Sequence, residues 1–222
     1  MTTAKDLFII AMSPEPEHAV GQGDLSLALA GAELIDLITA GAVTLDGDRI
    51  VPGGPTPPAD RLLDEAAAQL TRQPPHEPVE DWLWRRGQDL AAAYQAALEE
   101  DGELTRKRGG RLSFGPERVE PADTPARRAA AERWEEREPV LTALASAVGV
   151  DGEGPDGEER QDGEGPGTDR PDDERPGDEP GLGGDAATTV VAAVHDAVME
   201  LEAVRQRRTI ENAAFANLWR GP

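Results

Sequence analysis

The chain has 222 residues and a net charge of −22, and 38% of its residues are apolar. It contains no cysteine, which excludes disulfides and thiolate chemistry and fits a reducing cytoplasm. The apolar run Leu7–Met12 is too short for a signal peptide, and no apolar stretch approaches the roughly 20 residues of a membrane span. We therefore expect a cytoplasmic protein that is soluble or peripheral on the cytoplasmic face of a membrane.

The negative charge is unevenly distributed. Residues 1–150 carry 15 basic and 26 acidic side chains (−11), residues 151–185 carry 3 and 14 (−11), and residues 186–222 carry 4 and 4. An acidic chain repels phosphate backbones, so the charge argues against a nucleic-acid partner. The two lysines stand against 20 arginines, and with the abundant Ala, Gly and Pro this bias suggests a GC-rich, bacterial gene.

The first 70 residues predict two helices separated by a β-hairpin. An apolar helical stripe runs from Leu27 to Ile38, with Asp24 as a candidate N-cap and Gly41 as a helix stop. Short β-prone runs around an Asp-Gly-Asp turn predict a hairpin near 42–51. A proline-rich stretch then delays the next helix until about residue 60.

The following 80 residues predict further helices and a second hairpin. A helix begins near Val79 and ends at Gly102, and Gly87 can interrupt it. Two short strands around a Gly-Gly tip predict a hairpin near 103–114. Thr124 can cap the next helix, which Pro139 breaks or kinks. The fold class is therefore mainly α: residues 1–150 form a compact helical bundle domain with two short β-hairpins.

The last third of the chain divides into two parts. Residues 151–185 contain one large apolar residue, Leu182, and cannot bury enough surface to offset their ordering entropy, so we expect an acidic disordered linker. Residues 186–222 regain a helical apolar stripe that includes Val190, Val194 and Val198. We expect these C-terminal helices to pack back on the core.

No motif points to catalysis. The chain has no G-x-S-x-G, P-loop, G-x-G-x-x-G or H-E-x-x-H sequence. The three histidines, His18, His76 and His195, have no matching partner, and the adjacent Asp64 and Glu65 point apart on a helix. We expect a protein that is not an enzyme and that needs no cofactor or metal.

Four segments resemble the Golgi phosphoprotein 3 family when taken in chain order. They are the opening run LFIIAM (7–12), the central LAGAELIDL…GAV (29–43), PT…LLDEA (55–66), and Trp82 followed by LEEDGEL (98–104). The resemblance covers roughly residues 5–150. It implies a mainly helical cytosolic protein that binds phosphatidylinositol 4-phosphate, sits peripherally on membranes, holds client proteins there and self-associates through a β-hairpin.

The lipid pocket of eukaryotic family members uses a tryptophan and three arginines. Ungapped matching places the tryptophan at Gly21 and the arginines at Ala30, Gln88 and Ala91. None of these four residues retains the pocket chemistry. Recognition of an anionic headgroup would therefore need other cations.

Two basic clusters are the candidates for binding a lipid or another anion. Their members are Arg85 and Arg86, which follow two tryptophans, and Arg106, Lys107, Arg108 and Arg111 on the second hairpin. Arginine forks pair well with phosphate oxygens. The alternative for the hairpin cluster is a solvated edge strand that its charges protect from aggregation.

Two other functions stay open at this stage. Helix–hairpin units with a basic tip are also the pattern of a winged-helix DNA-binding regulator, although the acidic core disfavours it. A protein-only scaffold whose acidic segment 151–185 binds a basic partner is the second alternative.

Overall fold

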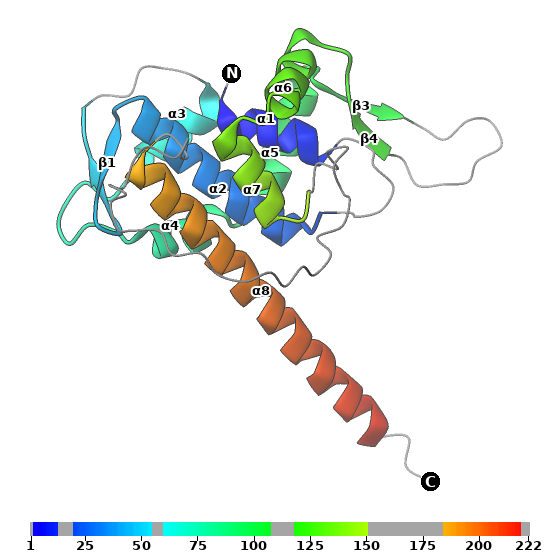
Figure 1. Ribbon diagram of the computed structural model, residues 1–222. Helices are drawn as coiled ribbons and strands as arrows, with labels where there is room; N and C mark the ends of the chain where they lie inside the picture. Colours follow the sequence, from blue (N-terminus) through cyan, green and yellow to red (C-terminus); the bar gives the residue numbers. More distant parts are fainter. Residues whose placement is uncertain (1, 13–19, 55–59, 108–117, 151–183, 219–222) are drawn as a thin grey trace, which may run out of the picture.

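The computed structural model describes residues 2–12, 20–54, 60–107, 118–150 and 184–218, with residues 107, 118 and 212–218 described by backbone alone. Figure 1 shows helices gathered around one central helix. The elements are α1 (Thr3–Ala11), α2 (Gln22–Thr39), β1 (Val43–Asp46), β2 (Arg49–Pro52), α3 (Arg61–Ala68), α4 (Val79–Arg86), α5 (Leu90–Glu100), β3 (Leu104–Lys107), β4 (Arg118–Pro121), α6 (Pro125–Glu135), α7 (Pro139–Ala147) and α8 (Asp185–Leu218). Within the described residues the fold is mainly α with two short hairpins, which confirms the expected class.

Helix α2 lies at the centre of the bundle and is buried on almost every side. It packs against α1, α3, α4, α5, α7 and α8, and residues 25–35 are all buried. A helix that is apolar nearly all round belongs in a core rather than at a surface. The sequence pattern predicted its N-cap at Asp24, but the helix begins earlier, with Gly21 at the N-cap and Asp24 in the first turn.

Gly31 allows α8 to approach α2 closely. A Cβ at residue 31 would lie 2.4 Å from Cγ2 of Val194, which is itself fully buried. The side chains of α8 that face the core are small or β-branched and include Ala187, Val190 and Ala197. The two helices therefore pack through a glycine on one side and valines on the other.

The two hairpins each form one antiparallel two-stranded sheet. The first lies where the sequence predicted it, and its Ile50 side chain reaches the core while the Ile50 N–H donates to the Glu77 carbonyl at 2.9 Å. The second is longer than the predicted 103–114, because β3 pairs with β4 (118–121) and residues 111–114 lie outside the described residues. Buried Leu104 and half-buried Val119 hold this stem to the core, so the return strand forms where an apolar side chain can pack.

The C-terminal region differs from the expected set of packed helices. It is one continuous helix, α8, whose first half lies on α2, α4 and α7 and whose second half extends away from the body (Figure 1). From Gln206 to Glu211 every residue is exposed. The apolar stripe ends there because Arg207 and Arg208 interrupt it. The expected disordered linker falls almost wholly on residues 151–183, outside the described residues.

We predict that Gly31→Ala destabilises the fold by about 1–3 kcal/mol, since the added methyl must displace α8 or strain Val194. Urea unfolding followed by circular dichroism measures the effect. Gly54→Ala is the matched control, because nothing lies within 4 Å of the place that a Cβ would take at that residue. Equal unfolding midpoints for the two variants would contradict the close approach of α2 and α8.

Candidate functional site

Arg86 lies inside the core and not at a surface. Its side chain is 8% exposed and forms a bidentate pair with fully buried Glu33: Nε donates to Oε2 at 2.7 Å and Nη2 donates to Oε1 at 2.8 Å. The same Nη2 donates to the Leu62 carbonyl, and the Tyr94 hydroxyl donates to Glu33 at 3.1 Å. Burial raises the pKa of Glu33, and the hydrogen bonds from Arg86 oppose that rise. The charge of Arg86 is therefore used to join α2, α3, α4 and α5.

Arg85 lies one residue away and faces solvent. Its side chain is 40% exposed and pairs with Glu77, to which Nε and Nη2 each donate at 2.7 Å. The guanidinium also lies 5.1 Å from the ring centroid of buried Trp82. Its hydrogen bonds with Glu77 raise the pKa of Arg85. Of the first candidate cluster, the structure thus leaves one arginine at the surface, and an acidic side chain already engages it.

The second candidate cluster lies on the β3–β4 hairpin, which extends from the body beside α6 (Figure 1). We refer to residues 104–121 as the basic hairpin. Arg106 is 56% exposed and donates to Glu99 at 2.7 Å. Lys107 is the register partner of Arg118, so two basic residues lie directly opposite each other at the outer end of the described stem. Arg108 and Arg111 lie outside the described residues.

Of the four residues that sequence matching aligned with a lipid pocket, two are buried. Ala30 is fully buried, and its carbonyl accepts a hydrogen bond from Trp82 Nε1 at 3.1 Å. Ala91 is 5% exposed, and its N–H donates to Ser26 Oγ. Gln88 is exposed, and Gly21 caps α2. Two of the three residues that sequence matching assigned to arginine positions are therefore part of the packed core.

A cation that the sequence analysis missed lies beside Gly21. Arg205 of α8 donates through Nη1 to both carboxylate oxygens of Asp24, at 2.8 and 2.7 Å. Its Nη2 would lie 3.4 Å from a Cβ at residue 21. Because Arg205 and Asp24 are 181 residues apart, no local sequence pattern could predict this pair. Arg118 was missed for a different reason: the return strand was placed too early.

Two acids support the first helix, of which Asp6 is fully buried and Asp36 is half-buried. Asp36 on α2 accepts from the N–H groups of Thr3 at 3.0 Å and Ala4 at 3.2 Å, and so caps α1 from a neighbouring helix. Asp6 is fully buried and bonded to Arg133 of α6. Burial raises the pKa of both carboxyls. These groups stabilise the packing of α1.

The described residues offer no metal site, because no group of three or more His, Asp or Glu side chains lies close enough to hold an ion. Nor does any helix in the described part of the chain have the length and apolar character to cross a membrane. His195 is exposed on α8.

Comparison with known proteins gives one result for almost the whole chain. The family model described as Golgi phosphoprotein 3 (GPP34) matches residues 4–201. This range includes the basic hairpin and the packed half of α8. A comparison with curated proteins found no match.

We predict that Arg86→Met lowers the free energy of unfolding by about 3–5 kcal/mol, because it leaves the buried Glu33 carboxylate without a cationic partner. Arg85→Met is the adjacent control and should cost no more than about 1 kcal/mol. The double variant Glu33→Leu/Arg86→Met should recover most of the loss. Urea titration of the three proteins measures these differences, and a similar cost for Arg85→Met and Arg86→Met would contradict the assignment.

We also predict that the urea midpoint rises as the pH falls from neutral toward the ordinary carboxyl pKa of about 4. The raised pKa values of Asp6, Glu33 and Asp36 mean that the folded state holds more protons than the unfolded state. Stability therefore decreases as pH rises from the ordinary carboxyl pKa of about 4 through the folded pKa values.

The variant Asp36→Asn tests the pH effect, because it keeps an oxygen acceptor for α1 and removes one titrating group. Its midpoint should vary less with pH than that of the parent protein. A parent midpoint that falls on acidification over this range would contradict the prediction.

Proposed function

This chain belongs to the Golgi phosphoprotein 3 family, and from that premise we propose that it is a non-enzymatic peripheral-membrane adaptor. The basic hairpin is the part that binds anionic phospholipid headgroups. The family's own ligand is phosphatidylinositol 4-phosphate, as the resemblance of the sequence implies. In this chain the cations of the hairpin bind the phosphate, and the residues at the family's pocket positions do not.

The pairing of Lys107 with Arg118 is the observation that carries the proposal. Like charges directly opposite each other in an antiparallel pair destabilise a sheet. Phosphate oxygens placed at the end of this stem would remove that repulsion and accept hydrogen bonds from both residues. Arg108 and Arg111 add two more cations in the sequence between the strands.

The stem is held firmly enough to present these residues. The Ala122 N–H donates to the Glu103 carbonyl at 2.8 Å, and the Thr124 hydroxyl also bonds to the Glu103 side chain. Glu99 on α5 engages Arg106 from the side of the core. The rest of the chain is acidic and is repelled by an anionic surface. The basic residues of the hairpin are attracted to such a surface, so we propose that the hairpin faces the membrane.

Headgroup phosphate can come from two sources, a phosphoinositide monoester or the diesters of bulk anionic lipids. Ala30 and Ala91 are buried, so they offer no pocket for a single headgroup. A basic hairpin at the surface responds to the charge density of the membrane, which favours the bulk anionic lipids as the source. The adaptor role follows from the family premise: a protein that sits on a membrane through one hairpin leaves its remaining surface for a client protein.

We predict that Lys107→Ala/Arg108→Ala/Arg111→Ala weakens cosedimentation with phosphatidylglycerol vesicles about 100-fold, at roughly 1 kcal/mol per cation near the surface. Removal of three exposed arginines elsewhere, Arg61, Arg72 and Arg128, is the charge-matched control. That variant should bind nearly as tightly as the parent protein.

Three further arms distinguish the possible ligands. Phosphatidylcholine vesicles should bind no protein, and vesicles with phosphatidylinositol 4-phosphate should gain only what their added charge supplies. Bulk DNA tests the winged-helix alternative, for which we expect no salt-sensitive shift. A parent protein that binds none of the anionic vesicles, or a control variant that loses as much binding as the hairpin variant, overturns the proposal.

A further inference from the structure

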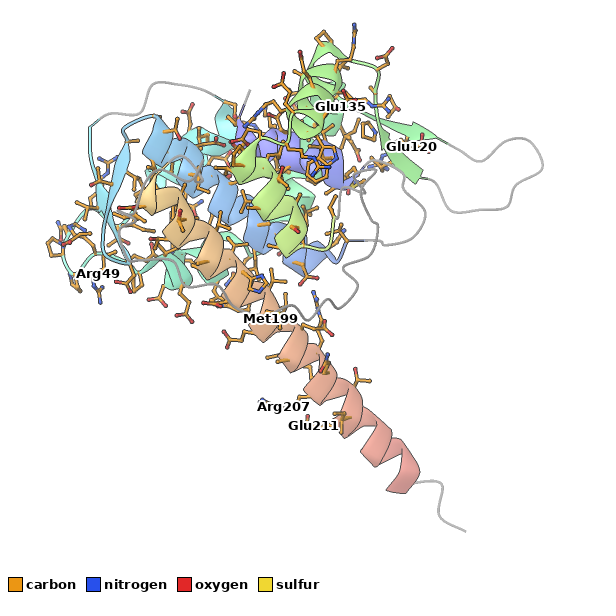
Figure 2. All side chains as sticks on the ribbon, in the orientation of Figure 1. Arg49, Glu120, Glu135, Met199, Arg207 and Glu211 are labelled. Carbon is orange, nitrogen blue, oxygen red and sulfur yellow. The ribbon has the colours of Figure 1, made fainter. Side chains whose placement is uncertain are left out.

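Helix α8 extends beyond the core and carries exposed apolar side chains on the face that points away from the bundle. Among the described residues, the large apolar side chains that are exposed are Met199, at 60%, and Ile210, at 69%. Both belong to α8. Figure 2 shows Met199 where the helix leaves the body, with Arg207 and Glu211 on the extended part.

Met199 and Ile210 lie on the same face of the helix. Eleven residues correspond to three turns plus about 20°, and the two residues are about 16 Å apart along the axis. Exposed Ala192, Ala203 and Gln206 fall on the same line, which faces away from the core side chains Val190 and Val194. We call this line, from Ala192 to Ile210, the outer stripe.

One end of the outer stripe borders a hollow between α7 and α8. This hollow has a volume of about 330 Å³ and is lined by Ala143, Ser146, Ala147, Val191, Ala192, His195 and Asp196. Small side chains on both helices leave room for a larger apolar side chain from outside. Asp196 supplies an acidic group at its edge.

The charges of α8 are divided along its length. Residues 185–204 carry Asp185, Asp196, Glu200 and Glu202 and no Lys or Arg, whereas residues 205–211 carry three arginines and Glu211. Arg205 is engaged by Asp24, but Arg207 and Arg208 are exposed on the extended part. One half of the helix is thus acidic and the other basic.

We propose that α8 pairs antiparallel with α8 of a second copy of this chain. A two-fold axis close to residues 201–202 places Ile210 of each copy over the α7–α8 hollow of the other. The same register brings Arg207 of one copy opposite Asp196 of the second copy, and the two Met199 side chains lie near the axis. The surface is self-complementary, as a two-fold interface requires.

The division of charge favours a second copy over a membrane as the partner. An anionic bilayer would attract Arg207 and Arg208 but repel Asp196, Glu200 and Glu202, which lie on the turns just before them. An antiparallel copy instead brings Arg207 of each copy opposite Asp196 of the other. This pairing is independent of the basic hairpin, which lies on β3 and β4.

Sedimentation equilibrium of the full chain tests the pairing. We expect a dimer whose dissociation constant rises at least about tenfold in Ile210→Asp, in Arg207→Glu and in Asp196→Arg. The double variant Asp196→Arg/Arg207→Glu restores opposite charges across the axis and should dimerise as tightly as the parent protein. Arg128→Glu on α6 is the control reversal and should leave the dimer unchanged.

The outcomes separate this inference from the alternatives. A monomer at all concentrations overturns it, and so does a dimer that none of the α8 variants weakens, which would place self-association at another surface such as the hairpin. Failure of the double variant to recover would refute the register. Vesicle binding that is lost in Arg207→Glu while the chain stays monomeric would assign the helix to a membrane instead.

Discussion

The ion pair between Glu33 and Arg86 is the constraint around which the bundle is organised. A carboxylate in the middle of a helix that is buried on almost every side is very costly unless a partner neutralises it. Arg86 does so from α4, Tyr94 adds a hydrogen bond from α5, and the Leu62 carbonyl accepts from the same guanidinium. This network fixes one side of α2 and leaves the side around Gly31 for α8.

Arg85 and Arg86 show what a sequence cannot decide. Neighbouring residues on a helix point about 100° apart, so one of the two faces α2 and the other faces solvent. The phase of α4 could be read from Trp82 and Leu83, but nothing local indicated that a glutamate lies inside the core. Their identical chemistry made both arginines candidates for the same surface, and only the tertiary partner Glu33 separates them.

Elements with a strong local pattern were predictable, and elements that depend on distant contacts were not. The apolar stripe of α2 and the turn between β1 and β2 depend on consecutive residues. The return strand β4 depends on Val119 packing against the core, and the long α8 depends on helix propensity continuing past the point where packing stops. Arg205 and Asp24 lie near opposite ends of the sequence, so no local pattern predicts their ion pair.

The described cations of this acidic chain differ in what they contact. Arg85, Arg86, Arg133 and Arg205 are each engaged by a carboxylate and stabilise the fold. Lys107 and Arg118 are register partners at the end of the described stem, and Arg207 is exposed on the extended part of α8. The described hydrogen bonds around Glu33 and Arg86 join α2, α3, α4 and α5, so this network does not depend on the cations of the hairpin or of α8. The bundle of this family member therefore depends on the pair of Glu33 and Arg86, and Ala30 and Ala91 contribute to it as buried core side chains.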